Sequence, residues 1–241
     1  MVVSQKFYIG YRDVDCNLKM KNNAVLDLFQ EMAGIHAAKC GQGTGQIDTA
    51  WVLTGYKVNI LKRPMYGQTV EVITWAREIK GITSCREFEI KSNDGESMVV
   101  AVSNWAHVNI ANKKLVKIDE EVAAAYGLEP DKTNFNESKL KRISEPDNYE
   151  YIKEYDVDWD WIDCNNHMNN TYYTVAAEMT LPEEIKIRND YSGLEIMYKK
   201  EIKYKDKIKC LYAELDDSYV VSIKNEDLSE LHAIVKLTKN V

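Results

Sequence analysis

The chain lacks long apolar runs and has no excess of positive charge. No apolar stretch approaches the roughly 20 consecutive residues that a membrane-spanning helix needs, and residues 1–10 have no signal-peptide core. The formal net charge is −7 at pH 7, which argues against nucleic acid as the main partner. We expect a soluble globular protein with no membrane span and no nucleic-acid partner.

Cysteine and histidine are too few and too scattered to indicate a metal site. The five cysteines are an odd number without paired spacing, and the four histidines lie far apart. Free thiols in a reducing cytoplasm are the expected state. The loop 42–48 is rich in glycine but lacks the Lys-Ser/Thr ending of a phosphate-binding loop. We expect no metal and no cofactor.

Hydrophobic periodicity divides the first half of the chain into a helix and several strands. A strand is expected at 7–14, and a helix begins at Asn22 or Asn23 and stops near Gly41. The helix has one apolar stripe, formed by Val25, Leu28, Phe29, Met32 and Ile35. The period then changes to two, which predicts strands at 51–61, 69–79, 83–92 and 98–109, with a hairpin turn at 93–95.

The same order of elements follows a second time after a polar region. A short helix at 119–126 and a linker precede a strand at 149–158 and a short helix at 171–179. Further strands are expected near 194–204, 208–215, 219–225 and 230–237. We predict an α+β protein with domains at 1–130 and 149–241, joined by a linker at 131–148.

Sequence identities support an internal duplication. Residues 15–22 read DCNLKMKN, and residues 163–170 read DCNNHMNN; further on, 64–70 (PMYGQTV) lies over 202–208 (IKYKDKI). Lys19 stands where His167 stands, and Arg63 stands where Glu201 stands. Only the second copy has the imidazole and the carboxylate, so we predict a single active site in the second unit.

The segment 161–170, WIDCNNHMNN, is the densest group of reactive side chains in the sequence. Asn170 is a candidate N-cap for the helix that follows, whose expected apolar face is Tyr172, Val175, Ala176 and Met179. A carboxylate, an amide and an imidazole before a helix N-terminus can supply a base or nucleophile, an orienting group and a proton carrier. The alternative is a turn rich in Asn and Asp that only caps the helix.

These blocks resemble the acyl-acyl carrier protein (acyl-ACP) thioesterases of bacteria and plant plastids. Residues 66–75, YGQTVEVITW, are similar to that family's W-G-D-T-V-E-V-x-T-W block, and 163–170 is similar to its D-x-N-x-H-V-N-N motif. The resemblance implies a tandem double hot-dog fold, in which each unit is a central helix wrapped by an antiparallel sheet. It also implies hydrolysis of a fatty acyl thioester carried on ACP.

The resemblance carries four catalytic residues onto this chain: Asp163, Asn165, His167 and Glu201. Residues 198–202, YKKEI, align with the family's Y-R-R-E-C, so Ile202 replaces a cysteine and a Cys–His mechanism cannot operate there. Cys164 and Cys210 are expected to be small buried thiols. Either Asp163 or Glu201 activates water, or one carboxylate attacks directly, while His167 transfers a proton. Backbone N–H groups at the second helix are expected to bind the oxyanion.

The resemblance also places the acyl chain in the first domain, against the long helix. The expected substrate-binding residues are Val25, Leu28, Phe29, Met32, Asn169 and Asn170. Six lysines between 199 and 209 are a candidate docking surface for the acidic carrier protein, although alternating lysines also protect the exposed edge strands of a sheet. Such edges can also pair two chains, so a homodimer remains open, as does the preferred chain length.

Three other functions compete with ACP thioester hydrolysis. A thioesterase of the same fold could act on acyl-coenzyme A, which has the same pantetheine arm. A hot-dog dehydratase is disfavoured because its motifs differ from those found here. A non-catalytic acyl-binding sensor would be expected to lose the polar group of residues, which this chain retains.

Overall fold

The computed structural model describes residues 1–45, 47–189 and 191–240. Contacts divide the chain into two compact units, of which the first comprises Met1–Met20 and Ala24–Leu140. The second comprises Lys21–Asn23 and Lys141–Val241. Among the described residues, no helix is both long and apolar enough to span a membrane.

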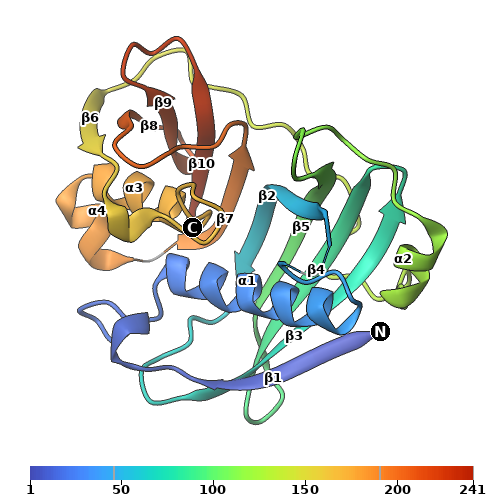
Figure 1. The fold of residues 1–241 in the computed structure, drawn as a ribbon. Helices are drawn as coiled ribbons and strands as arrows, with labels where there is room; N and C mark the ends of the chain where they lie inside the picture. The colour runs from blue at the N-terminus through green and yellow to red at the C-terminus, as the bar shows by residue number, and fades with distance from the viewer. Residues whose placement is uncertain (46, 190, 241) are drawn as a thin grey trace. The chain divides into compact units, whose positions relative to one another are not determined.

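The first unit is a helix on a five-stranded antiparallel sheet (Figure 1). Its helices are α1 (Asn22–Lys39) and α2 (Glu120–Ala125), together with the short 3-10 helix η1 (Tyr11–Asp13). Its strands are β1 (Val2–Tyr8), β2 (Thr49–Ile60), β3 (Thr69–Lys80), β4 (Thr83–Ser92) and β5 (Ser97–Asn109). They lie in the order β1-β3-β4-β5-β2. The predicted long helix, the four strands after it and the turn at 93–95 are confirmed.

The apolar stripe of α1 forms the core of this unit. Phe29 is fully buried and stacks on Phe88 of β4 with 4.7 Å between ring centroids, and it lies 6.3 Å from Tyr56 of β2. Val25 and Met32 are also buried, whereas Leu28 and Ile35 are half-buried. Burying a large apolar side chain stabilises a fold by about 1.5–3 kcal/mol, so this stripe holds the helix on the sheet.

Part of the polar region after α2 is packed against the sheet of the first unit. The indole of Trp75 donates to the carbonyl of Lys132, and Arg77 donates to the carbonyl of Phe135. Phe135 packs in a small cluster with Cys85 and Val102 on the sheet. The region therefore covers the side of the sheet away from α1, which explains why the alternation expected along β4 is incomplete there.

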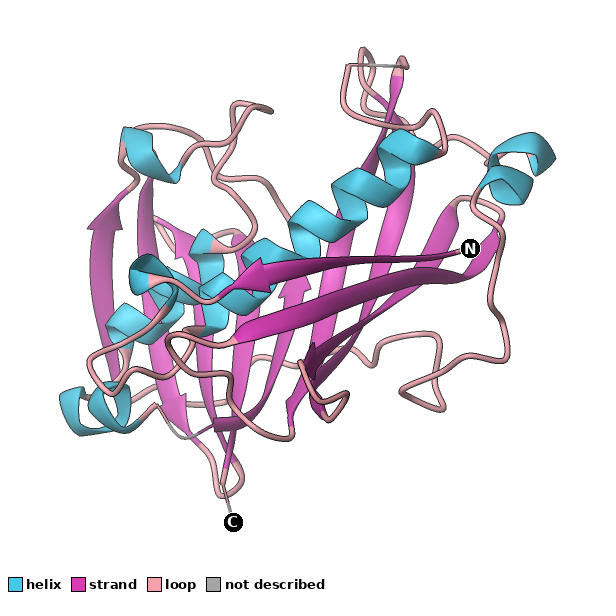
Figure 2. Ribbon diagram, turned by 90° about the horizontal axis from the view of Figure 1, so that it is seen from below, coloured by secondary structure: helices cyan, strands magenta, loops and turns pink. Residues whose placement is uncertain are grey.

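The second unit also has a five-stranded antiparallel sheet with a helix packed on it. Figure 2 shows the helices of the chain in cyan and its strands in magenta. Its strands are β6 (Tyr151–Asp156), β7 (Tyr191–Tyr198), β8 (Lys207–Glu214), β9 (Ser218–Asn225) and β10 (Leu231–Lys239), in the order β7-β10-β9-β8-β6. Its helices are η2 (Trp159–Trp161), α3 (Tyr172–Thr180) and α4 (Glu183–Arg188). Helix α3 contacts β6, β8, β9 and β10.

Two predictions of local structure were wrong, and one short helix was missed. The first strand lies at Val2–Tyr8, not 7–14, because η1 begins after Gly10, whose N–H is accepted by the Asp13 carboxylate. Strand β7 ends at Tyr198, and the predicted continuation to 204 is a turn. Helix α4 was not predicted, although two glutamates in its first turn and basic residues in its last favour a short helix.

The buried face of α3 also differs from the prediction. Ala176 is buried as expected, but Tyr172 and Val175 are half-buried and Met179 is exposed. The side chains that face the core are Tyr173, Thr174, Ala176, Ala177 and Thr180. The pairs Tyr172-Tyr173 and Ala176-Ala177 give the helix two faces of similar hydrophobicity, so the sequence did not show which face is buried. The buried hydroxyl of Thr180 donates a hydrogen bond to the carbonyl of Ala176.

Candidate functional site

The predicted catalytic motif forms a tight loop between η2 and α3. The N–H groups of Asp163 and Asn166 close it, donating to the carbonyls of His167 (2.9 Å) and Asp163 (3.0 Å) respectively. The Asp163 carboxylate accepts from the backbone N–H of Asn165 at 2.8 Å and from its side-chain amide at 3.3 Å. Asn166 adopts a left-handed conformation with φ of 62°. Local hydrogen bonds therefore shape the loop, and Asp163 is its main acceptor.

The first unit contains the same loop. The N–H groups of Asp15 and Leu18 donate to the carbonyls of Lys19 and Asp15 at 2.9 and 3.0 Å, and the Asp15 carboxylate accepts from the N–H of Asn17 at 2.8 Å. Leu18 has a φ of 61°. The duplication inferred from identities is thus reproduced in these three hydrogen bonds and in the left-handed residue.

A second turn, between β7 and β8, supports the loop, and it too has a copy in the first unit. Met168 donates to the carbonyl of Ile202 at 2.7 Å, as Met20 does to that of Pro64 at 2.8 Å. The side chain of Asp206 accepts from the N–H of Lys203. In the first unit, Gln68 accepts in the same way from the N–H of Met65. Ile202 is fully buried, so the residue at the family's cysteine position is part of the packing here.

The two copies differ in the side chains that they have at equivalent positions of the loop and the turn. In the second unit Nε2 of His167 lies 2.9 Å from Oε2 of Glu201, and both side chains are about one-third exposed (32% and 30%). Nζ of Lys203 lies 3.8 Å from the other carboxylate oxygen of Glu201. In the first unit Arg63 occupies the position of Glu201 and donates to the carbonyl of Met20. The imidazole–carboxylate pair is therefore confined to the second copy and is accessible to solvent.

Two tyrosines that were not predicted as site residues donate hydrogen bonds to backbone carbonyls in the two segments that contain His167 and Glu201. The hydroxyl of Tyr173 donates to the carbonyl of Lys200, next to Glu201, and the hydroxyl of Tyr198 donates to the carbonyl of Asn170. Burial raises the pKa of Tyr173, and the negative charges of Glu201 and Asp163 raise it further, so the phenol remains a donor. Both tyrosines were visible in the sequence, but nothing in their spacing indicated these contacts.

The last two asparagines of the motif are engaged at the start of α3. The side-chain oxygen of Asn169 accepts from the N–H and the hydroxyl of Thr171, and its carbonyl accepts from the N–H of Tyr172. Thr171, not Asn170, is the N-cap residue. Two of the N–H groups expected to bind an oxyanion therefore already have acceptors, and Asn169 supplies both of them.

The cysteines are free but do not join the His167–Glu201 pair. Cys210 is buried as expected, and burial raises the pKa of its thiol to about 12. Cys164 is exposed, contrary to the expectation of a buried thiol, because it lies in a loop that is closed by backbone hydrogen bonds and not by side-chain packing. Cys16, at the same place in the first-unit loop, is exposed as well.

The predicted acyl-binding residues on α1 lie within the first unit, beside a buried polar group. His36 of α1 is fully buried, and Nη1 of Arg86 on β4 donates to its Nδ1 at 2.8 Å. Desolvation and the charge of Arg86 lower the pKa of His36 to about 3, so the ring is neutral and accepts this bond at Nδ1. Arg86 also donates to the hydroxyl of Thr74 at 3.1 Å.

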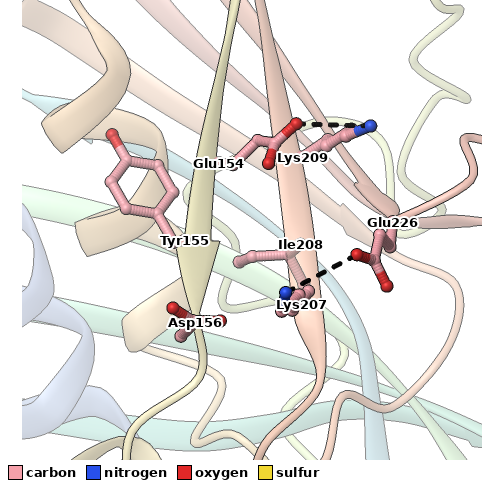
Figure 3. Close-up of a pocket in the computed structure, with 7 residues that line it drawn as sticks. All are labelled: Glu154, Tyr155, Asp156, Lys207, Ile208, Lys209 and Glu226. Carbon is pink, nitrogen blue, oxygen red and sulfur yellow. Dashed lines mark ion pairs between the residues drawn. The ribbon is translucent and has the colours of Figure 1, made fainter.

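A shallow hollow between β6 and β8 is a different feature of the second unit (Figure 3). Its walls carry the ion pairs Lys209–Glu154 (3.3 Å) and Lys207–Glu226 (3.7 Å). None of the predicted catalytic residues lines it. Within the described residues, no three His, Cys, Asp or Glu side chains are grouped so that they could hold a metal ion.

Family models decide the relationship of this chain to known proteins. The N-terminal domain of acyl-ACP thioesterases matches residues 1–126, and the C-terminal domain matches residues 144–240. The chain belongs to the acyl-ACP thioesterase family. The resemblance inferred from the motifs is thereby confirmed for both halves of this thioesterase-family chain.

Individual relatives are similar to this family member at low identity. Oleoyl-acyl carrier protein thioesterase 1 of Arabidopsis thaliana is 25% identical over 228 residues, covering 86% of this chain and 62% of the relative. The acyl-[acyl-carrier-protein] hydrolase FATB3 of Cuphea viscosissima is 25% identical over 210 residues, covering 82% of this chain. The chain spans only 51% of that second relative, and both are chloroplastic.

Solved structures of the family have the same fold. An acyl-ACP thioesterase from Bacteroides thetaiotaomicron superposes with a TM-score of 0.87 at 20% identity, covering 98% of this chain and 97% of its own. The 12:0-ACP thioesterase from Umbellularia californica superposes with a TM-score of 0.85 at 21% identity, covering 98% and 96%. The predicted α+β tandem hot-dog fold is confirmed.

Proposed function

We propose that this chain hydrolyses the thioester between a fatty acyl chain and acyl carrier protein, releasing a free fatty acid. The observation that carries this proposal is the His167–Glu201 pair, held at 2.9 Å on a framework whose other copy lacks both groups. Membership of the acyl-ACP thioesterase family supplies the substrate class. The five free cysteines agree with action in a reducing cytoplasm.

In the proposed mechanism, Glu201 orients His167 and His167 moves the proton. With Nε2–H directed at the carboxylate, Nδ1 has the lone pair that can take a proton from water. The water oxygen attacks the thioester carbon, the C–S bond breaks, and the imidazolium returns its proton to the departing pantetheine sulfur. The products are a carboxylic acid and a thiol. The carboxylate stabilises the imidazolium while it exists, as an acidic partner does for other catalytic histidines.

Asp163 and Asn165 have positioning roles in this proposal. The Asp163 carboxylate accepts two hydrogen bonds from Asn165, and Asp15 accepts from Asn17 in the loop that has neither His nor Glu. A residue pair that persists with the same geometry where the chemistry is missing shapes the loop. Direct attack by Asp163 would weaken the hydrogen bonds that its carboxylate accepts from Asn165.

The substrate residues of the first unit complete the proposal. Val25, Leu28, Phe29 and Met32 belong to the apolar face of α1, and Leu28 is half-buried and so can contact a bound chain without first leaving the core. We assign acyl-chain contact to this face, with Leu28 as its most accessible member. Acyl-coenzyme A remains the competing substrate because it has the same pantetheine arm.

The decisive experiment measures fatty acid release from acyl-ACP and from acyl-coenzyme A with wild type and Glu201→Gln. Release from acyl-ACP that falls by about 10²-fold or more in the variant supports the reaction and the site together. Cleavage of acyl-coenzyme A alone would overturn the carrier-protein assignment. Binding of both substrates without cleavage would replace the enzyme with an acyl-binding protein.

A further inference from the structure

The turn that holds Glu201 is strongly cationic in a chain that is acidic as a whole. Residues 199–209 contain six lysines and only two carboxylates, Glu201 and Asp206, whereas the net charge of the chain is −7. We call the six side chains the lysine surface: Lys199, Lys200, Lys203, Lys205, Lys207 and Lys209. The surface begins directly beside the catalytic pair, because Nζ of Lys203 lies 3.8 Å from Glu201.

Protection of a sheet edge does not explain these lysines. Strand β8, which holds Lys207 and Lys209, is paired with β6 on one side and β9 on the other. Lys199, Lys200, Lys203 and Lys205 lie in the turn before β8 and belong to no strand. Lysines that protect an edge stand on an unpaired strand, and neither group does.

The first unit shows that the turn folds without three of these lysines, although Lys62 is retained at the position of Lys200. Its equivalent turn, at residues 61–71, has the same backbone hydrogen bonds, and the positions of Lys199, Lys203 and Lys205 are taken by Leu61, Met65 and Gly67. Gly67 and Lys205 both have positive φ, 84° and 69°. Glycine adopts this conformation without steric cost, whereas a lysine there is strained. The second unit therefore keeps an ammonium group where the fold favours glycine.

Two of the lysines have no carboxylate partner among the described residues. Lys200, Lys207 and Lys209 pair with Glu230, Glu226 and Glu154. Lys199 is exposed and makes no ion pair, and the ammonium of Lys205 lies 5.2 Å from the centre of the Tyr204 ring. Their charges are not neutralised within the described part of the chain, so an anionic partner gains the full attraction.

We propose that the lysine surface is where acyl carrier protein docks, with Lys199 and Lys205 facing acidic side chains of the carrier. The assignment rests on the proposed hydrolysis of a carrier-bound chain. A docked acidic protein would have its pantetheine arm beside His167 and Glu201, because the surface and the pair share one turn. Charge complementarity of this kind increases the association rate and weakens with salt.

The test compares wild type with Lys199→Gln/Lys205→Gly, which removes the two unpaired charges and restores the residue that the first unit uses at the strained position. A matched control, Lys114→Gln/Lys117→Gln, removes two lysines of the first unit. Steady-state kinetics use lauroyl-ACP, lauroyl-coenzyme A and lauroyl-N-acetylcysteamine, which has the thioester but no carrier and no phosphate. Each is measured at low and at physiological salt.

We expect KM for lauroyl-ACP to rise about fivefold to tenfold in the surface variant, with kcat unchanged and a weaker salt dependence. KM for the N-acetylcysteamine thioester stays the same, and so do all constants of the control. An unchanged KM for lauroyl-ACP overturns the docking assignment. An equal rise with lauroyl-coenzyme A also overturns it, because the lysines would then recognise phosphate. Failure of wild type to hydrolyse lauroyl-ACP while it cleaves the small thioester would instead refute the carrier-protein substrate itself.

Discussion

Asp163 and Asp15 accept the same hydrogen bond, from the backbone N–H two residues further on, at the same distance of 2.8 Å. The loop of Asp163 contains His167, and the turn beside it contains Glu201. The loop of Asp15 contains Lys19 instead, and its neighbouring turn contains Arg63. The first-unit loop is therefore an internal control for the proposed site. We assign what the two loops share to folding, and we propose that His167 and Glu201, which only the second unit has, perform the chemistry.

We expect Glu201→Gln to reduce kcat by about 10²–10³-fold, since an amide cannot stabilise an imidazolium as a carboxylate does. Its side chain is about one-third exposed, so the melting temperature should change little. Fatty acid release and thermal unfolding measure the two effects. Arg63→Gln, at the same position of the first unit, is the matched control and should leave kcat unaltered. Retention of more than a tenth of the activity by Glu201→Gln would remove Glu201 from the mechanism.

Substitutions of Asp163 separate a structural aspartate from a reacting one. Asp163→Asn keeps an oxygen for the N–H of Asn165, so we expect kcat to remain within about tenfold of wild type, with an unaltered pH profile. Asp163→Ala removes the acceptor and should cost about 1 kcal/mol of unfolding free energy. Asp15→Ala should cost a similar amount without affecting kcat. A loss in Asp163→Asn as large as that in Glu201→Gln would show that the carboxylate itself reacts.

His36 should make the protein less stable in mild acid. Its pKa is lowered to about 3 in the folded protein from an ordinary value of about 6.5, so below pH 6.5 the unfolded chain binds a proton that the folded chain does not. Stability is therefore greatest above pH 6.5 and falls as the pH decreases toward 3, by about 2 kcal/mol between pH 7 and 5 from this residue.

Urea unfolding of wild type and His36→Gln at pH 7, 6 and 5 measures this contribution. The glutamine oxygen can accept the bond from Arg86, and its free energy of unfolding should vary less with pH. Burial also lowers the pKa of His107, so a residual slope of the same sign remains. Equal slopes in both proteins would contradict a neutral His36.

The apolar face of α1 should show two kinds of behaviour. Phe29→Ala removes a fully buried ring stacked on Phe88 and should lower the free energy of unfolding by about 3–5 kcal/mol. Leu28→Trp enlarges a half-buried side chain and should shift the released fatty acids toward shorter chains, with a small effect on stability. The exposed Leu115 provides the control, Leu115→Trp. An unchanged product distribution in Leu28→Trp would place the acyl chain elsewhere.

Local sequence was sufficient for what depends on neighbours along the chain. Apolar residues at helical spacing placed α1, alternation placed β2 to β5, and Asn-Asp-Gly placed the hairpin, since each signal acts within a few residues. The identities between 15–22 and 163–170 established the duplication. The sequence also predicts that the site lies in the second copy, because Lys19 and Arg63 stand at the positions of His167 and Glu201 in the first copy.

Tertiary structure decided what depends on residues far apart in sequence. It showed that the Asp163 carboxylate accepts a hydrogen bond within its own turn and that Asn169 accepts one at the start of α3. It also showed that the hydroxyls of Tyr173 and Tyr198 donate to backbone carbonyls of the segments around the site. It also chose which apolar face of α3 is buried. These outcomes follow from the pairing of hydrogen-bond donors with acceptors and from close packing, both of which require distances between distant segments that periodicity does not contain.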